Sequence, residues 1–319
     1  MRIVVLGAGG FIGNHLCRRL KTDGHWVRGV DIKAPQWSPT PVDEFQLRDL
    51  RAPAQAYLAL LGDVDQVYQL AADMGGIGHI SEHHAEIARN NVLINVSCLD
   101  AALVAPTRAP RWLYTSSACV YPAAAQKHAA LAGLSEDEAW PADPEPGYGL
   151  EKLFSEKLCE YYARDHGLDV RVARLHNVYG PEGTWTGGRE KAPAAICRKV
   201  AEATGAIDLW GDGQQTRSFC YVDDAIEGLV RLMASSHTRP LNLGSEELVS
   251  IEELARIVAR VAGKDLSVHW DPTKPQGVRG RNSDNTTLRE VLGGWEPRIP
   301  LAEGIARLYP WIAEQVRTA

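Results

Sequence analysis

Residues 2–13 read RIVVLGAGGFIG, and this stretch decides the fold. The first five residues form a short apolar run that ends at a glycine, which is typical of a buried parallel strand. Gly7, Gly10 and Gly13 then follow the GxxGxxG spacing, and residues 14–21 continue in a helical pattern. This order predicts a strand, a tight glycine turn and a helix whose N-terminal N–H groups face a pyrophosphate.

An acidic residue in the next strand indicates which dinucleotide is bound. The apolar run Trp26 to Val30 predicts a second strand, and Asp31 follows it directly, with Lys33 two residues further on. A carboxylate at this position accepts hydrogen bonds from both ribose hydroxyls and repels a 2′-phosphate. We therefore expect NAD rather than NADP as the cofactor.

Composition excludes several classes of protein. The chain has 319 residues, 45% of them hydrophobic and 23% charged, and a net charge of -6. These values are ordinary for a globular protein with one large or two modest domains, and they give no basic surface for nucleic acid. No apolar run approaches the roughly 18 residues of a membrane span. The six scattered cysteines match no metal-site spacing, so we expect reduced thiols, no metal and a cytoplasmic protein.

Two short stretches indicate redox chemistry. Tyr148 and Lys152 are four residues apart in a helical pattern that runs to about residue 166, so both lie on one helix face. A fixed ammonium there favours the phenolate and is expected to lower the pKa of Tyr148 toward working pH. Upstream, a strand predicted over residues 111–116 leads into Ser117 and Cys119. A serine hydroxyl aimed at the same substrate oxygen would help to move a proton while hydride leaves the carbon.

The rest of the sequence predicts further strands and helices of an α/β protein. Strands are expected at 64–72 and 168–175, a long helix at Glu82 to Ala105, and a flexible glycine-rich loop at 73–79. The alternation of strands and helices predicts a Rossmann-type, doubly wound parallel sheet. We expect residues 1–175 to form an NAD-binding domain. Residues 176–319 are expected to form mainly a smaller α/β substrate domain, partly interleaved with the first.

The dinucleotide motif and the Ser-Tyr-Lys set resemble the extended short-chain dehydrogenases/reductases that act on nucleotide sugars, the NAD-dependent epimerases and dehydratases. The resemblance covers essentially the whole chain. Longer motifs narrow it, and together they are similar to the GDP-mannose 3,5-epimerase family. The motifs are AADMGG (71–76), SSACVYP (116–122), YGLEK (148–152), HNVYGP (176–181), GTWTGGREKAPAA (183–195), WGDGQQTRSF (210–219) and GVRGRNSDN (277–285).

The resemblance implies an activity and a set of catalytic roles. GDP-mannose would be epimerised at C3 and C5 through a transient 4-keto intermediate with recycled NAD, giving GDP-L-galactose and/or GDP-L-gulose. Ser117, Tyr148 and Lys152 would serve oxidation and reduction at C4. Cys119 and Lys191 would stand on opposite faces of the sugar and exchange protons at C3 and C5, with the assignment of base and acid at each carbon left open.

The same resemblance implies binding residues and a homodimer. Arg217 and Arg281 would clamp the diphosphate of a GDP-sugar. The helices at 82–105 and 148–166 would pair across a two-fold axis into a four-helix bundle. The cofactor-binding set is Gly7, Gly10, Phe11, Ile12, Gly13, Asp31, Asp49, Tyr148 and Lys152, and the substrate-binding set is Gly75, Asn177, Glu190, Lys191, Ala192, Lys199, Gln215, Thr216, Arg217 and Arg281.

Two other interpretations stay open. One is a different NAD-dependent nucleotide-sugar enzyme: a C4 epimerase, a dehydratase, or an epimerase acting on a GDP-heptose. The other is a non-catalytic NAD-binding regulator on the same fold. Such regulators commonly lose one member of the YxxxK pair, and both Tyr148 and Lys152 are present here.

Overall fold

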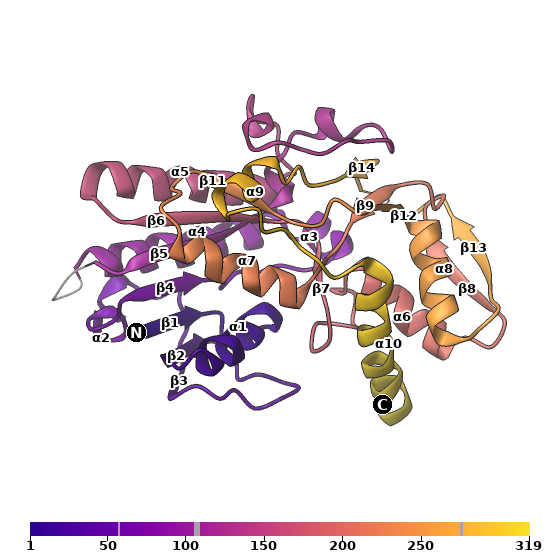
Figure 1. Cartoon of the computed structure of the whole chain (residues 1–319), viewed down its shortest axis with the longest axis horizontal. Coiled ribbons are helices and arrows are strands. Elements are labelled where there is room, and N and C mark those ends of the chain that lie inside the picture. The colour runs from indigo at the N-terminus through magenta and orange to yellow at the C-terminus, as the bar shows by residue number, and fades with distance from the viewer. Residues whose placement is uncertain (57, 105–108, 275–276) are drawn as a thin grey trace.

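A seven-stranded parallel sheet forms the centre of the molecule (Figure 1). The computed structural model describes residues 1–56, 58–104, 109–274 and 277–319. The strand order is β11-β6-β5-β4-β1-β2-β3, and every neighbouring pair is parallel. The predicted α/β fold with a Rossmann-type sheet is confirmed. The strands are β1 (Arg2–Leu6), β2 (Trp26–Asp31), β3 (Glu44–Leu47), β4 (Gln66–Gln69), β5 (Arg111–Ser117), β6 (Val170–Leu175) and β11 (Pro240–Leu243).

Alternate residues of each strand supply two cores, one on each face of the sheet. In β1, Ile3 and Val5 belong to one buried cluster, whereas Val4 and Leu6 belong to another. This is the result expected of a strand buried on both faces. Helices α1 (Phe11–Thr22) and α7 (Val222–Ala234) supply the first cluster, and α4 (His84–Leu103) and α5 (Tyr148–His166) supply the second. The short elements η1 (Ala54–Ala56), α2 (Leu58–Leu61) and α3 (Ile77–Glu82) lie between β3 and α4 in the chain.

The second half of the chain adds smaller sheets and helices beside the carboxyl ends of the central strands (Figure 1). β8 pairs with β13, β7 pairs with β10, and β12-β9-β14 form a three-stranded sheet. The elements are β7 (Val178–Tyr179), α6 (Ala192–Glu202), β8 (Ala206–Trp210), β9 (Thr216–Ser218), β10 (Cys220–Tyr221), β12 (Leu248–Ser250), α8 (Ile251–Ala262), β13 (Ser267–Asp271), β14 (Gly280–Arg281), α9 (Thr286–Val291) and α10 (Leu301–Thr318). The division at 175/176 stays a prediction. β11 and α7 come from the later segment, yet they join the central sheet and its covering layer.

Several predicted segments differ from the structure in their bounds. The strands expected at 64–72 and 168–175 are shorter, as β4 (Gln66–Gln69) and β6 (Val170–Leu175). The loop expected over 73–79 already contains the start of α3, because Gly76 is the residue that precedes its first turn. The helix expected from Glu82 to Ala105 begins at His84, and Ala105 lies outside the described residues. The helix expected over 148–166 has those bounds. None of the helices in the described part of the chain is long and apolar enough to cross a membrane.

Candidate active site

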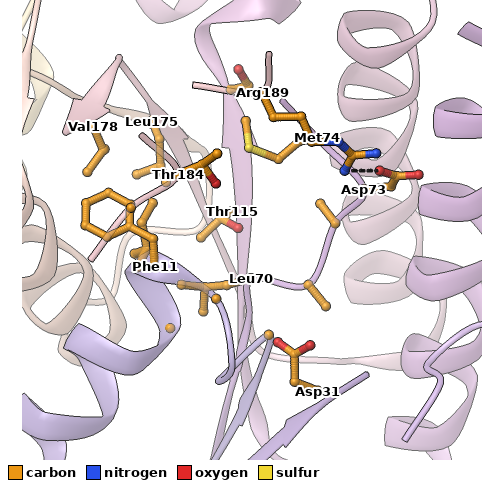
Figure 2. Close-up of a pocket in the computed structure, with 18 of the residues that line it drawn as sticks. Phe11, Asp31, Leu70, Asp73, Met74, Thr115, Leu175, Val178, Thr184 and Arg189 are labelled. Carbon is orange, nitrogen blue, oxygen red and sulfur yellow. Dashed lines mark ion pairs between the residues drawn. The ribbon is translucent and has the colours of Figure 1, made fainter. Parts of the chain in front are cut away.

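A cavity of about 530 Å³ opens at the carboxyl ends of β1, β2, β4 and β5 (Figure 2). Ligands of open α/β sheets bind at this edge, because the loops that leave the strands diverge there. The end of β2 contributes Asp31, the loop after β4 contributes Asp73 and Met74, and the end of β5 contributes Thr115. All nine residues predicted to bind the cofactor line this cavity: Gly7, Gly10, Phe11, Ile12, Gly13, Asp31, Asp49, Tyr148 and Lys152.

The glycines of the first turn differ in what surrounds them. Gly7 has φ +89°, a conformation that side chains rarely adopt. A Cβ at Gly13 would lie 2.0 Å from the carbonyl oxygen of Gly7, so only glycine lets α1 approach β1 this closely. A Cβ at Gly10 would meet only that same oxygen, at 3.3 Å. Gly10 also precedes α1 without a side-chain cap, so the positive dipole end of that helix lies at the cavity, where it suits a phosphate.

Acidic groups stand where the adenosine ribose of a dinucleotide is expected. Asp31 accepts from the backbone N–H groups of Gly9, at 2.9 Å, and Lys33, at 3.1 Å, which fixes its carboxylate at the cavity wall. Burial raises the pKa of Asp31, and the backbone hydrogen bonds oppose that rise. Asp49 lines the same cavity and pairs with Arg51 at 2.6 Å. A glycine cradle followed by a fixed carboxylate fits NAD.

Tyr148, Lys152 and Ser117 meet at the inner end of the cavity. The Lys152 ammonium donates to the carbonyl oxygen of Thr115 at 3.1 Å and lies 5.6 Å from the ring centroid of Tyr148. Ser117 hydrogen-bonds the Tyr148 hydroxyl. The expectation that Lys152 alone would lower the pKa of Tyr148 is wrong for the protein without cofactor. Burial raises the pKa of Tyr148 well above its ordinary value, because the phenolate loses its water, and the hydrogen bond from Ser117 opposes this only in part.

Lys152 is itself a buried cation with one close carboxylate. Its side chain is 3% exposed, and its Nζ lies 4.0 Å from Oε1 of Glu151. Burial lowers the pKa of Lys152, while the Glu151 charge raises it. Asn91 of α4 donates to the same Glu151 oxygen at 2.7 Å. The ammonium is therefore held in place by groups of α5, β5 and α4 rather than by solvent.

Cys119 lies in a single 3₁₀ turn, η2 (Ala118–Val120), directly after β5. Ser117 accepts from the backbone N–H of Cys119 at 3.2 Å, and Nη1 of Arg281 lies 3.3 Å from the Cys119 sulfur. Burial raises the pKa of the thiol, and the Arg281 charge opposes that rise. Cys119 is 9% exposed and is not among the residues that line the 530 Å³ cavity.

Lys191 joins this group from the other half of the chain. It precedes α6 and lines the cavity. Burial lowers the pKa of Lys191, and a Cys119 thiolate would raise it, so the two groups are close enough to interact electrostatically. The structure thus brings the five predicted catalytic residues together from three separate stretches of sequence: Ser117, Cys119, Tyr148, Lys152 and Lys191.

Two arginines of the predicted substrate set lie side by side. Arg217 of β9 and Arg281 of β14 are register partners in parallel strands, so their side chains leave the same face. Arg217 donates to the carbonyl oxygens of Thr216 and Val278, each at 2.6 Å. Burial and the neighbouring Arg281 lower the pKa of Arg217. Two adjacent guanidinium groups with little water around them make a site suited to an anion.

Of the ten residues predicted to bind substrate, Lys191 alone lines the cavity. Asn177 has φ +42° and donates to the carbonyl oxygen of Ser218 at 2.9 Å. Lys199 donates to the carbonyl oxygen of Asp208 at 2.5 Å. Asn177 and Lys199 therefore already bond to backbone carbonyl groups of the protein.

The other predicted substrate residues include two with unpaired oxygens. Thr216 donates through its hydroxyl to the carbonyl oxygen of Ala129 at 2.6 Å. Oε1 of Gln215 and Oε2 of Glu190 are buried and have no hydrogen-bond partner. Buried acceptors of this kind are uncommon unless a ligand or water completes them. Gly75 packs against His79, and Ala192 is the first residue of α6.

The structure contains an ion pair across the cavity that the sequence analysis does not predict. Arg189 lies 3.5 Å from Asp73, as the dashed line in Figure 2 marks, and the carbonyl oxygen of Arg189 accepts from the N–H of Gly76 at 2.9 Å. A Cβ on Gly76 would lie 2.5 Å from the carbonyl oxygen of Glu190. The loop before α6 therefore lies against the loop after β4. Both loops fall within the quoted motifs, but nothing in either motif pairs one with the other.

All six cysteines are buried free thiols. Within the described ranges, no group of three or more His, Cys, Asp and Glu side chains is arranged to hold a metal ion.

Comparison with known proteins gives concordant matches. The model of the NAD dependent epimerase/dehydratase family matches residues 3–244. GDP-mannose 3,5-epimerase 1 of Oryza sativa subsp. indica is 46% identical over 99% of this chain and 82% of its own length. GDP-mannose 3,5-epimerase of Arabidopsis thaliana is 46% identical over 99% of this chain and 83% of its own. The structure of UDP-glucuronic acid 4-epimerase from Bacillus cereus in complex with UDP-glucuronic acid and NAD is 26% identical, with TM-score 0.84, over 99% of this chain and 100% of that one.

Proposed function

The chain belongs to the NAD-dependent epimerase/dehydratase family, and on that premise we propose that it epimerises GDP-mannose at C3 and C5. It is an NAD-dependent nucleotide-sugar epimerase. The proposal adds the substrate, the two carbons and the route, which is a transient 4-keto intermediate with internally recycled NAD. The products would be GDP-L-galactose and/or GDP-L-gulose.

The observation that carries the proposal is the position of a thiol and an amine beside the redox residues. Inverting a carbon needs a group that removes a proton from one face and a group that returns one to the other face. Cys119 and Lys191 provide such groups, and they come from opposite halves of the chain. A simple C4 epimerase requires only Tyr148, Lys152 and Ser117. In such an enzyme Cys119 and Lys191 would have no role in the reaction.

Held by the glycine turn and Asp31, NAD would supply the hydride acceptor for oxidation at C4 and the hydride for the later reduction. Tyr148 removes the proton of the C4 hydroxyl, and Ser117 hydrogen-bonds the same tyrosine oxygen. Lys152 places a positive charge 5.6 Å from the Tyr148 ring, which stabilises the phenolate as it forms.

At C3 and C5, the 4-ketone makes the hydrogens acidic. In our mechanism the Cys119 thiolate and the Lys191 amine act from opposite faces, one removing a proton and the other returning one. Burial lowers the pKa of Lys191. A lysine with a lowered pKa exchanges protons near neutral pH more readily than an ordinary one. Arg281 stabilises the Cys119 thiolate through its contact at 3.3 Å.

The substrate class follows from the paired arginines. Adjacent guanidinium groups with like charge repel each other unless an anion lies between or beside them. Arg217 and Arg281 have one carboxylate nearby, Glu145, at 3.7 Å from Arg281. A nucleoside diphosphate supplies the missing negative charge, and the GDP-mannose named for the two plant relatives supplies the sugar in this proposal.

We also propose a homodimer in which α4 and α5 pack against their copies. Leu150, Phe154 and Tyr161 of α5 are 57%, 48% and 44% exposed. Leu150 and Phe154 are four residues apart and Tyr161 is seven further on, so all three lie on one helix face. An apolar face of this kind fits a helix of a second copy. A cytoplasmic location, expected from the unpaired cysteines, stays a prediction.

Four variants test the proposed function with GDP-mannose in D2O. Tyr148→Phe should abolish both epimerisation and deuterium exchange, because no ketone forms. Cys119→Ala and Lys191→Ala should abolish epimerisation but still oxidise C4, with reduced cofactor accumulating as nicotinamide absorbance. Cys119→Ser should behave nearly like Cys119→Ala, with a rate loss on the order of 10²–10⁴, because a hydroxyl is a far weaker acid than a thiol. Full epimerisation by both Cys119 variants would refute the mechanism.

The alternatives give different results in the same assay. A C4 epimerase would invert C4 without incorporating deuterium at C3 or C5. A dehydratase would release water and a deoxy sugar. A GDP-heptose epimerase would leave GDP-mannose largely unchanged while showing the same exchange on the heptose. A non-catalytic regulator would bind NAD and give no exchange with any of these sugars.

A further inference from the structure

A carboxylate outside the predicted catalytic set lies beside the Cys119 thiol. Glu145 belongs to the loop before α5, and its side chain is 20% exposed. Its Oε2 lies 3.7 Å from Nη2 of Arg281, and the carboxylate is close enough to the Cys119 thiol to raise the pKa of that thiol. The same guanidinium reaches the Cys119 sulfur through Nη1 at 3.3 Å. Arg281 is therefore shared between the thiol and the carboxylate.

The backbone fixes Glu145 against Cys119. The N–H of Glu145 donates to the carbonyl oxygen of Cys119 at 3.1 Å, and the N–H of Leu150 donates to the carbonyl oxygen of Glu145 at 3.0 Å. A Cβ on Gly149 would lie 2.2 Å from the Cys119 carbonyl oxygen and 3.0 Å from Cβ of Glu145. The loop and the first turn of α5 are thus packed on η2, and the carboxylate is held beside the thiol by the fold.

Arg281 is held equally firmly on its other side. Its Nε donates to Oε1 of Gln126 at 2.6 Å. The amide nitrogen of Gln126 donates to the carbonyl oxygens of Tyr121 at 3.0 Å and Pro122 at 3.2 Å, which leaves Oε1 pointing at Arg281. The guanidinium is thus fixed with one nitrogen at the sulfur and another beside the carboxylate.

Several other charges surround the thiol, and most are positive. Among the residues that the structure describes, Glu145 is the carboxylate that raises the pKa of Cys119, while Arg281 lowers it. The titratable and charged groups that interact with Cys119 are Glu145, Tyr148, Lys152, Lys191, Arg217 and Arg281.

We propose that Glu145 is a positioning residue for the proton transfers of Cys119, an inference that rests on the proposed function. Between turnovers the carboxylate accepts the S–H hydrogen bond and holds Cys119 as the thiol. When Cys119 is the thiolate, Arg281 stabilises it through Nη1, which already lies 3.3 Å from the sulfur.

Glu145 itself neither gains nor loses a proton in this scheme. In the abstraction step, a C–H bond beside the 4-ketone breaks, its electron pair enters the enolate, and the proton forms the S–H bond. In the return step, at a carbon whose proton Lys191 has removed from the opposite face, the S–H bond breaks and its proton forms the new C–H bond as the enolate becomes the ketone again. The Glu145 carboxylate favours the Cys119 thiol and the Arg281 guanidinium favours the thiolate, so the two forms stay close in free energy. Cys119 can therefore both remove and return a proton.

Alkylation of Cys119 by iodoacetamide, followed at the Cys119 peptide by mass spectrometry over a range of pH, tests this role. The holoenzyme with NAD and without sugar is used, so the result does not depend on the substrate. In Glu145→Gln the midpoint of alkylation should fall by about one pH unit, the effect of removing one adjacent like charge. Asp143→Asn is the matched control, because Asp143 is an exposed carboxylate of the same loop, and its midpoint should not move.

Two results would overturn the proposal: an unchanged midpoint in Glu145→Gln, or equal shifts in both variants. A second measurement needs no change at Glu145. The S–H stretching band of Cys119, isolated as the infrared difference between the protein and Cys119→Ala, should lie at the lowered frequency of a thiol that donates to a carboxylate, and a free-thiol frequency would also refute the role. Failure of the proposed function appears separately, as full epimerisation by Cys119→Ala.

Discussion

The same added methyl group should have different effects at Gly13 and at Gly10. At Gly13 the new Cβ would lie 2.0 Å from the Gly7 carbonyl oxygen, whereas ordinary contacts begin at 3.4 Å, so α1 must move by 3.4 − 2.0, or roughly 1.4 Å. Overpacking of this size costs about 3 kcal/mol, and the better helix propensity of alanine returns about 1 kcal/mol. We therefore expect Gly13→Ala to lose about 2 kcal/mol, which is about 4–8 °C in melting temperature.

At Gly10 the added Cβ meets only the Gly7 oxygen at 3.3 Å, and the fold has room for it. Replacing a glycine before the first turn by alanine costs on the order of 0.5 kcal/mol, so Gly10→Ala should melt close to the unaltered protein. Its methyl group nevertheless occupies the side from which a pyrophosphate approaches the backbone. We expect the NAD dissociation constant to rise at least about tenfold, or roughly 1.4 kcal/mol.

Circular dichroism melts after removal of bound nucleotide, together with calorimetric titration with NAD, separate these two effects. An equal melting temperature for Gly13→Ala and the unaltered protein would refute the expected loss of stability, because the 2.0 Å contact would then be relieved without cost. The expected loss of NAD affinity is refuted if Gly10→Ala binds NAD with an unchanged dissociation constant.

Three further outcomes follow from single sites. Asp31→Asn should weaken NAD binding and reduce the preference for NAD over NADP, measured as the ratio of the two dissociation constants; an unchanged ratio would remove Asp31 from cofactor selection. His176 is fully buried, donates from Nε2 to Asn242 at 2.9 Å, and has its pKa lowered to about 4 by burial. Because the folded pKa lies below the unfolded value of about 6.5, the neutral ring stabilises the fold above pH 6.5, and about 3 kcal/mol of stability is lost as pH falls toward 4. The free energy of unfolding of His176→Gln in urea should therefore depend less on pH between 6.5 and 4. An identical pH dependence in the two proteins would contradict the role of His176. Phe154→Asp should convert a dimer to a monomer in sedimentation velocity without unfolding it, whereas an unaltered protein that is monomeric at micromolar concentration would refute the α4–α5 interface.

Features encoded within one short stretch could be predicted from the sequence. The GxxGxxG spacing, the strand ending in Asp31 and the Tyr148–Lys152 spacing each follow from local periodicity and from the conformational needs of glycine. The structure places all of them on one cavity, as expected. The helix that starts at Tyr148 could be predicted with an end at about residue 166, where Gly167 takes up a left-handed conformation that ends it.

Features that depend on residues far apart in the chain could not be predicted from the sequence. β11 joins the central sheet beside β6, although more than sixty residues separate them and a Leu-Asn-Leu run gives no hint of its partner. Arg281 and Cys119, which are in contact, are 162 residues apart, and Asp73 and Arg189, which form an ion pair, are 116 residues apart. The pKa of Tyr148 was predicted with the wrong sign because the sequence shows the neighbouring lysine but not the loss of water around the phenol.

The central claim is that protons are exchanged at C3 and C5 while hydride is retained at C4. Incubating the protein and NAD with GDP-mannose in D2O, and reading the products by NMR, measures this directly. We expect deuterium at C5 and C3 of the epimerised sugars, hydrogen retained at C4, and no net change in NAD. Products inverted only at C4, or epimerised sugars without deuterium at C3 and C5, would contradict it.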